Sequence, residues 1–136
     1  DMEQQALNKL MRDSASDAIK TSKEEFGIEL DFSSESISLI DTIISKFLDI
    51  YNDQALEDKA VFTICNIYGA YIGEVFRKLA GGQWQYNLQD EEAPSIMLMY
   101  QDKTFAFTGI CYERLVNDNT VSVERYFTEA IGGATQ

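Results

Sequence analysis

Apolar residues recur at steps of three and four along the first half of the chain, which is the spacing of one face of an α-helix. Residues 2–25 carry such a series without glycine or proline, and Gly27 follows as a suitable residue for a helix C-terminus. A second series runs to Tyr51 after Ser33 and Ser34, either of which can cap a helix N-terminus. The pattern therefore predicts two amphipathic helices before residue 52.

A third helical series spans about residues 54–80 and is apolar around most of its circumference. Such a helix is normally buried at the centre of a domain. Gly81 and Gly82 end it, since glycine favours termination of a helix. Before the second helix, apolar and acidic residues alternate over 28–32, which predicts a short extended segment.

A period of two replaces the helical period after the third helix. Residues 83–89 alternate between glutamine or asparagine and a large apolar residue, which predicts a half-buried strand. Runs of β-prone residues at 96–100 and 104–108 flank a polar turn at 101–103 and predict a hairpin. Residues 89–94, between the strand and the hairpin, are interpreted as an acidic loop.

The last quarter of the chain is less regular. Residues 110–116 fit either a helix or a strand, and Thr120 can cap a last helix that continues through Ile131. We expect residues 132–136, which begin with two glycines, to form a flexible tail. Three N-terminal helices, a small antiparallel sheet and a C-terminal helix together predict a single α+β domain over residues 2–131.

Charge narrows the set of partners that such a domain would bind. The 136 residues include 23 acidic and 11 basic side chains, a formal net charge of −12. Binding to nucleic acid or to an anionic membrane surface needs clustered lysine and arginine, so we expect a basic protein partner instead. Residues 61–80, the most apolar stretch, contain Asn66, Glu74, Arg77 and Lys78, so no membrane span is predicted.

The chain contains no histidine and two cysteines, Cys65 and Cys111. A serine–histidine–aspartate triad, a cysteine–histidine pair and a histidine-ligated metal site are thereby excluded within one chain. No calcium-loop or phosphate-loop spacing is present, so we expect no metal, no cofactor and no enzymatic activity. We interpret the cysteines as reduced, buried thiols of a cytoplasmic protein without a signal peptide, while one disulfide between them stays open.

Most of the negative charge lies on the second helix and its flanks. Residues 26–58 hold eight acids and one base, a net charge of −7. Like charges at this density repel one another, which favours either a solvated surface or a docking face for a basic partner. Such a face could also mimic nucleic acid toward a nuclease or a repressor. The candidate partner-binding residues are Glu35, Asp41, Asp49, Asp53, Glu57 and Asp58.

Small residues recur every four positions along the third helix, at Cys65, Gly69 and Gly73. Glycine inside a helix costs about 1 kcal/mol relative to alanine, so the two glycines predict the close approach of another element. Glu74 can pair with a basic residue about one turn later. An alternative site is a small-molecule pocket lined partly by sheet aromatics, formed by Tyr71, Glu74, Trp84 and Tyr86.

The same region carries a resemblance. Residues 68–77 read Tyr-Gly-Ala-Tyr-Ile-Gly-Glu-Val-Phe-Arg, and Gly81-Gly82-Gln83-Trp84 follows. This resembles a group of small bacterial domains of unknown function, in which a Gly-Ala-Tyr-aliphatic-Gly-Glu helix leads through Gly-Gly-x-Trp into a sheet. The likeness covers roughly residues 60–130 and implies a bacterial accessory protein, from a mobile gene cassette or a toxin-immunity pair. This resemblance implies no catalytic residues.

These patterns together predict a non-enzymatic, acidic interaction protein that binds a basic partner, with an immunity or inhibitor role as one version. The alternative function is a small-molecule-binding module. An enzyme that uses a carboxylate with a raised pKa is the third. A homodimer formed through an apolar helix face or a sheet edge also stays open.

Overall fold

The computed structural model describes residues 2–51, 57–87 and 95–134. Helices account for most of these residues and three short strands form an antiparallel sheet, which confirms the predicted α+β class. Two short helical segments, a 3₁₀ turn η1 and a π-helical segment η2, accompany the longer elements. The order is α1 (Met2–Phe26), η1 (Ser34–Ile37), α2 (Ser38–Ile50), α3 (Asp58–Ala80), β1 (Gln83–Asn87), β2 (Ser95–Tyr100), β3 (Lys103–Phe105), α4 (Phe107–Tyr112), η2 (Glu113–Asn117) and α5 (Val123–Ala134).

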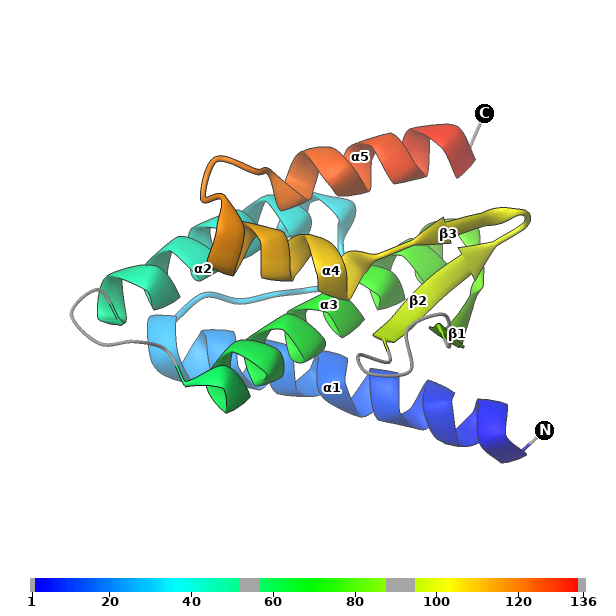
Figure 1. The fold of residues 1–136 in the computed structure, drawn as a ribbon, viewed down its shortest axis with the longest axis horizontal. Helices are drawn as coiled ribbons and strands as arrows, with labels where there is room; N and C mark the ends of the chain where they lie inside the picture. The colour runs from blue at the N-terminus through cyan, green and yellow to red at the C-terminus, as the bar shows by residue number, and fades with distance from the viewer. Residues whose placement is uncertain (1, 52–56, 88–94, 135–136) are drawn as a thin grey trace.

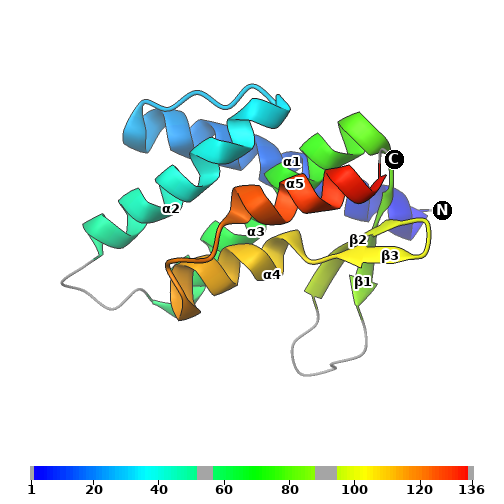
Figure 2. The same ribbon diagram turned by 90° about the horizontal axis from the view of Figure 1, so that it is seen from above.

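Helix α3 occupies the centre of the molecule (Figure 1). It packs against α1 and, on another side, against α4 and α5, and twelve of its 23 residues are buried. This confirms the central position that its all-round apolar sequence predicts. The sheet lies at the end of the molecule where α3 finishes, with the N- and C-terminal helix ends beside it (Figure 2). No helix in the described ranges is long and apolar enough to cross a membrane.

Local signals set the boundaries of the N-terminal helices as predicted. Helix α1 is followed by Gly27, whose φ of +65° suits glycine. Ser33 caps η1 by accepting a hydrogen bond from a backbone N–H three residues later, and η1 leads directly into α2. Helix α3 ends at Ala80, as expected. The predicted break before it, and its predicted first turn, fall on residues 52–56, which lie outside the described residues.

Residues 28–32 connect α1 to η1 and belong to no strand. Leu30 is buried in the core. Phe32 adopts a φ of +62°, and its backbone N–H donates to the hydroxyl of Tyr71 at 2.8 Å. The alternating apolar residues of this segment therefore belong to a connection between helices and not to a strand. At Phe32 the backbone N–H is paired with a side chain of α3 instead of with a neighbouring strand.

The sheet has the order β1-β2-β3 with antiparallel pairing throughout. Trp84, Leu98 and Phe105 lie opposite one another in adjacent strands, on the face turned toward the helices. The predicted hairpin is confirmed for β2 and β3, and its two-residue turn contains Gln101 with a φ of +54°. Leu88, the last apolar residue of the predicted first strand, lies outside the described residues together with the loop that follows.

The hairpin's second strand is shorter than the predicted 104–108, because the chain enters α4 at Phe107. The ring of Phe107 is fully buried and contacts aromatic rings of α3, β3 and α5. Packing in this aromatic cluster therefore outweighs the β-propensity of the local sequence. Residues 110–116, which fitted either helix or strand, are helical in α4 and η2.

Helix α5 begins and ends elsewhere than predicted. Thr120 does not cap it, because both the backbone N–H and the hydroxyl of Thr120 donate to the carboxylate of Asp118. The helix starts at Val123 and continues through Gly132 and Gly133 to Ala134. The helix therefore extends three residues beyond its predicted end at 131, into the first part of the predicted tail, of which residues 135–136 lie outside the described residues. The hydroxyl of Tyr100 donates to the carbonyl of Ala134 at 3.1 Å, which ties the end of α5 to β2.

Candidate functional site

The Gly-Ala-Tyr-Ile-Gly-Glu segment of α3 joins this helix to its neighbours. A Cβ placed on Gly73 would overlap the six-membered ring of Trp84, which lies directly on the helix backbone. A Cβ on Gly69 would lie 2.6 Å from Cα of Thr108 at the start of α4. The close approach predicted for the two glycines is confirmed, and their partners are a strand tryptophan and a helix backbone.

Glu74 fixes the indole ring that covers Gly73. Its Oε2 accepts hydrogen bonds from Nε1 of Trp84 at 3.0 Å and from Nη1 of Arg77 at 2.9 Å. Arg77 also donates through Nε to the carbonyl of Gly82, in the turn between α3 and β1. The predicted pairing of Glu74 with a basic residue is confirmed for Arg77. The carboxylate is thus engaged by two donors and holds the helix, the turn and the strand together.

The predicted small-molecule pocket at Tyr71, Glu74, Trp84 and Tyr86 is not formed by these four residues. Tyr71 and Trp84 are fully buried in the core. The hydroxyl of Tyr71 is hydrogen-bonded to Ser36 and accepts from a backbone N–H, and burial raises the pKa of this hydroxyl. Tyr86 alone among the four is exposed, at 44%.

The two cysteines are free in the structure, and both are buried as predicted. Burial raises the pKa of Cys65 to about 12 and that of Cys111 well above its ordinary value. Because the thiolate is the reactive form, neither side chain is activated as a nucleophile near neutral pH. The described residues also contain no group of three or more histidine, cysteine, aspartate or glutamate side chains that could hold a metal ion.

Asp41, the central member of the predicted acidic face, has an internal role. Its two carboxylate oxygens accept hydrogen bonds from the backbone N–H groups of Val123 and Glu124, at 2.9 and 3.0 Å. The same carboxylate lies 3.6 Å from Nε of the buried Arg114. Asp41 therefore caps the N-terminus of α5 from a distance of 82 residues along the chain and is not available to a partner.

The remaining acids do not form one continuous face. Glu35 lies on η1, at the start of α2, whereas Asp49, Glu57 and Asp58 are exposed at the opposite end of α2, where α3 begins (Figures 1 and 2). Asp53 lies outside the described residues. Between the two ends, the exposed side of α2 is of mixed character and consists of Ser38, Thr42, Lys46, Asp49 and Ile50. The acids do belong to this part of the chain, as the sequence indicated, but the length of α2 keeps Glu35 apart from Asp49.

Exposed apolar side chains point to a different site. Among the described residues, seven large apolar side chains are exposed, and four of them line one groove. These four come from four different elements: Leu10 of α1 (47% exposed), Phe62 of α3 (57%), Tyr86 of β1 (44%) and Tyr112 of α4 (36%). Contiguous exposed apolar surface of this kind marks binding sites more often than scattered apolar residues do.

We call this concavity the groove; its volume is about 700 Å³. A stripe of α3 lines it together with residues of α1 and α4, and Tyr86 and Ile96 of the sheet lie at one end. The lining residues are Leu10, Met11, Ser14, Phe62, Cys65, Asn66, Tyr86, Ser95, Ile96, Thr108, Gly109 and Tyr112.

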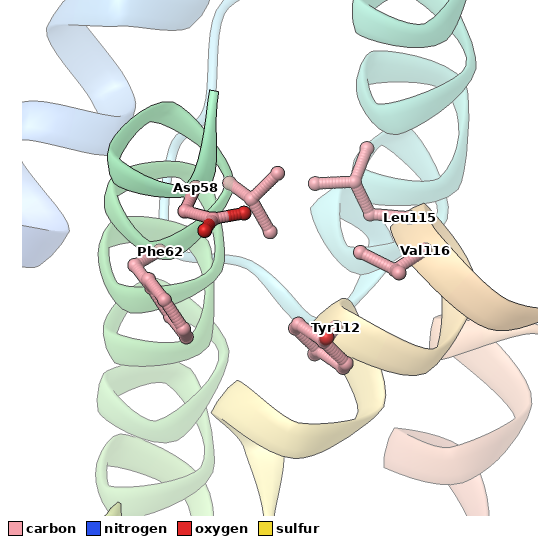
Figure 3. A pocket seen from close by; sticks show the side chains of 6 residues that line it. Asp58, Phe62, Tyr112, Leu115 and Val116 are labelled. Atoms are coloured by element: carbon pink, nitrogen blue, oxygen red, sulfur yellow. The ribbon is translucent and has the colours of Figure 1, made fainter. Parts of the chain in front are cut away.

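A smaller concavity of about 250 Å³, the end hollow, adjoins the groove and shares Phe62 and Tyr112 with it (Figure 3). The rings of these two residues are nearly parallel, with centroids 6.3 Å apart. Val116, another of the exposed apolar residues, lines the end hollow together with Asp58, Val61 and Leu115. The groove and the end hollow thus adjoin each other, the groove being mainly apolar and the end hollow containing a carboxylate.

Chemically, this surface is suited to binding. Of the described residues that line it, Asp58 is the one carboxylate, and none is a lysine or arginine. The other polar groups are hydroxyls and one amide, which orient a ligand by hydrogen bonding. No protein-family model, no curated protein and no solved structure matches the chain, so the site is interpreted from its own geometry.

Proposed function

We propose that this chain is a non-enzymatic interaction protein that binds a basic protein partner in the groove. The observation that carries the proposal is the convergence of four half-exposed, large apolar side chains from four elements on one concave surface. Interfaces between proteins depend on a few large, mostly aromatic anchors surrounded by polar residues. Three of the four side chains are aromatic, and the rest of the lining mixes apolar residues with the polar Ser14, Asn66, Ser95 and Thr108, which fits that composition.

Charge favours a basic partner over an acidic one. The chain carries a net charge of −12, and three exposed acids, Asp49, Glu57 and Asp58, lie at the end of the molecule where the end hollow opens. Complementary charge accelerates encounter and disfavours acidic competitors. Of the acidic residues singled out in the sequence, Asp58 lines the end hollow, Glu57 precedes it in the chain, and Asp49 is exposed near the end of α2.

A bacterial immunity or inhibitor protein is the specific version of this function that the resemblance implies. We propose a cytoplasmic location, because free Cys65 and Cys111 suit a reducing compartment. Small-molecule binding is the second candidate, since about 700 Å³ is within the range of ligand pockets. We favour a protein partner because small-molecule sites bury most of the ligand, whereas the groove's main apolar side chains are half exposed.

Selection of peptides from a random library displayed on phage tests the proposed function. We expect the enriched peptides to combine large apolar residues with lysine or arginine. Their affinity for Phe62→Ser should be at least about tenfold lower than for the unmodified protein, as is typical of removing a central anchor. Binding is measured by fluorescence anisotropy of the synthesised peptides.

Leu79→Ser is the matched control, because Leu79 is an exposed apolar residue of the same helix that does not line the groove. This variant should bind the peptides within about twofold of the unmodified protein, since single surface contacts outside a site contribute little. Enrichment of acidic peptides, equal loss in the two variants, or no enrichment at all would contradict the proposal.

A further inference from the structure

We infer that the partner segment is an amphipathic α-helix that lies along α3, with a lysine or arginine beside Asp58. This inference rests on the proposed function and adds the conformation of the partner and the position of its charge. Its apolar side would contact Leu10, Phe62 and Tyr112, the three half-exposed side chains contributed by helices.

The shape of the groove is the first argument. Phe62, Cys65 and Asn66 follow one another at steps of three and one along α3, so they form a single stripe of that helix. Small residues of the neighbouring helices, Ser14 of α1 and Gly109 of α4, also line the groove. Large side chains of an incoming helix fit between the bulky residues at such places, as in the packing of ridges into grooves between helices.

The hydrogen-bonding state of the backbone is the second argument. A partner that binds as an extended strand gains affinity by pairing with an unpaired strand edge. Tyr86 of β1 and Ile96 of β2, which both line the groove, are opposite each other in the β1–β2 pairing, so the edges that these two strands turn toward each other are already occupied. The remaining walls are helices, whose backbone groups are bonded internally. A helix, which satisfies its own backbone groups, therefore suits this surface better than a strand does.

The position of Asp58 is the third argument. Asp58 lies in the first turn of α3 and its carboxylate projects toward the space bounded by Leu115 and Val116 (Figure 3). From Asp58 to Asn66, α3 advances eight residues, about 12 Å at the rise of an α-helix. A partner helix of two to three turns therefore covers Phe62 while a basic side chain at its end reaches Asp58.

Defined peptides of leucine and lysine test this inference. One 16-residue peptide places its leucines at helical spacing, and a second of the same composition alternates leucine and lysine at strand spacing. A third replaces the lysines of the helical peptide with glutamine. We expect the helical lysine peptide to bind at least about tenfold more tightly than the alternating one, and to gain helical circular dichroism on binding.

Phe62→Ser and Asp58→Asn localise the binding, with Leu79→Ser as the control. Phe62→Ser should abolish most of the affinity for both helical peptides, while Leu79→Ser should not. Asp58→Asn should weaken the lysine peptide about threefold or more and leave the glutamine peptide unchanged, since it removes one charge from the end hollow. Equal effects of Asp58→Asn on both peptides would overturn the assigned position of the basic residue.

The outcomes separate the inference from the function on which it rests. If the alternating peptide binds as well as the helical one, and its binding depends on Phe62, the helical conformation is wrong and the groove function stands. If no peptide binds in a manner that depends on Phe62, both fail. If the helical peptide binds more tightly, with the dependence on Phe62 and Asp58 given above, both are supported.

Discussion

Replacement of Gly73 by alanine is expected to lower the free energy of unfolding by about 3 kcal/mol, the upper range for overpacking a core. The added methyl group overlaps the ring of Trp84, which is itself 1% exposed. The ring cannot retreat without cost, because its Nε1 donates to Glu74 and Glu74 is held by Arg77. The gain of about 1 kcal/mol in helix propensity offsets part of the clash and does not reverse it.

Urea denaturation followed by circular dichroism measures this effect, and the midpoint of thermal unfolding should fall by roughly 10 °C. Gly132→Ala is the matched control. Gly132 is also inside a helix, α5, but a Cβ there meets no atom within 4 Å. This control should be as stable as the unmodified protein or more stable by up to about 1 kcal/mol. If Gly73→Ala behaves like the control, the contact between α3 and Trp84 is not as described.

Removal of the Asp41 carboxylate is the second change with a large expected effect. Asp41→Ala should cost about 3 kcal/mol, because it removes the cap of α5 and the charge partner of a buried arginine. Arg114 is 8% exposed, its Nη2 donates to Ser45, and its Nη1 has no partner among the described residues. Without Asp41, the guanidinium would lose the carboxylate of its ion pair and keep the hydrogen bond to the hydroxyl of Ser45.

Two further variants separate the parts of this effect in the same denaturation experiment. Asp41→Asn keeps a hydrogen-bond acceptor for α5 and should cost less than Asp41→Ala, while Asp49→Ala should change stability by no more than about 0.5 kcal/mol, as is typical of exposed sites. Asp49 belongs to the same helix and is exposed. Equal stability of Asp41→Ala and Asp49→Ala would contradict the internal role of Asp41.

Signals within a few residues of each other predicted much of the fold. Gly27 and Ser33 end and begin helices through their own backbone and side chain, so the adjacent sequence suffices to locate them. The hydrophobic period likewise predicted α1, α2 and α3, and the alternation of Trp84 with glutamines predicted β1. These features depend on contacts between neighbours in the chain, and such contacts are visible in one sequence.

Features that depend on distant residues could not be predicted in this way. The cap of α5 comes from Asp41, 82 residues before Val123, so the nearer Thr120 was the better local candidate and was wrong. Phe107 enters a helix because aromatic rings from three other elements surround it. The separation of the acids is different, because it is local: Glu35 on η1 and Asp49 near the end of α2 lie at opposite ends of one helical stretch.

The groove left a weak signal in the sequence. Leu10, Phe62 and Tyr86 follow the apolar pattern of their elements, and of the three only Tyr86 was a candidate binding residue, in a pocket with other partners. Their exposure reflects how far the neighbouring elements extend, which periodicity does not record. The all-round apolar character of α3 was the available indication, because a helix apolar on every side needs a cover on every side. Phe62, near the N-terminus of α3, is the more exposed of the two large apolar residues of this helix that are exposed.

Mapping of amide chemical shifts by nuclear magnetic resonance tests the groove as the binding surface most directly. The protein labelled with ¹⁵N is titrated with the helical leucine–lysine peptide. We expect the largest shift changes at residues that line the groove and the end hollow: Leu10, Ser14, Asp58, Phe62, Asn66, Gly109, Tyr112 and Val116. Changes concentrated around Glu35, or on the outer sheet face at Met97 and Met99, would contradict it.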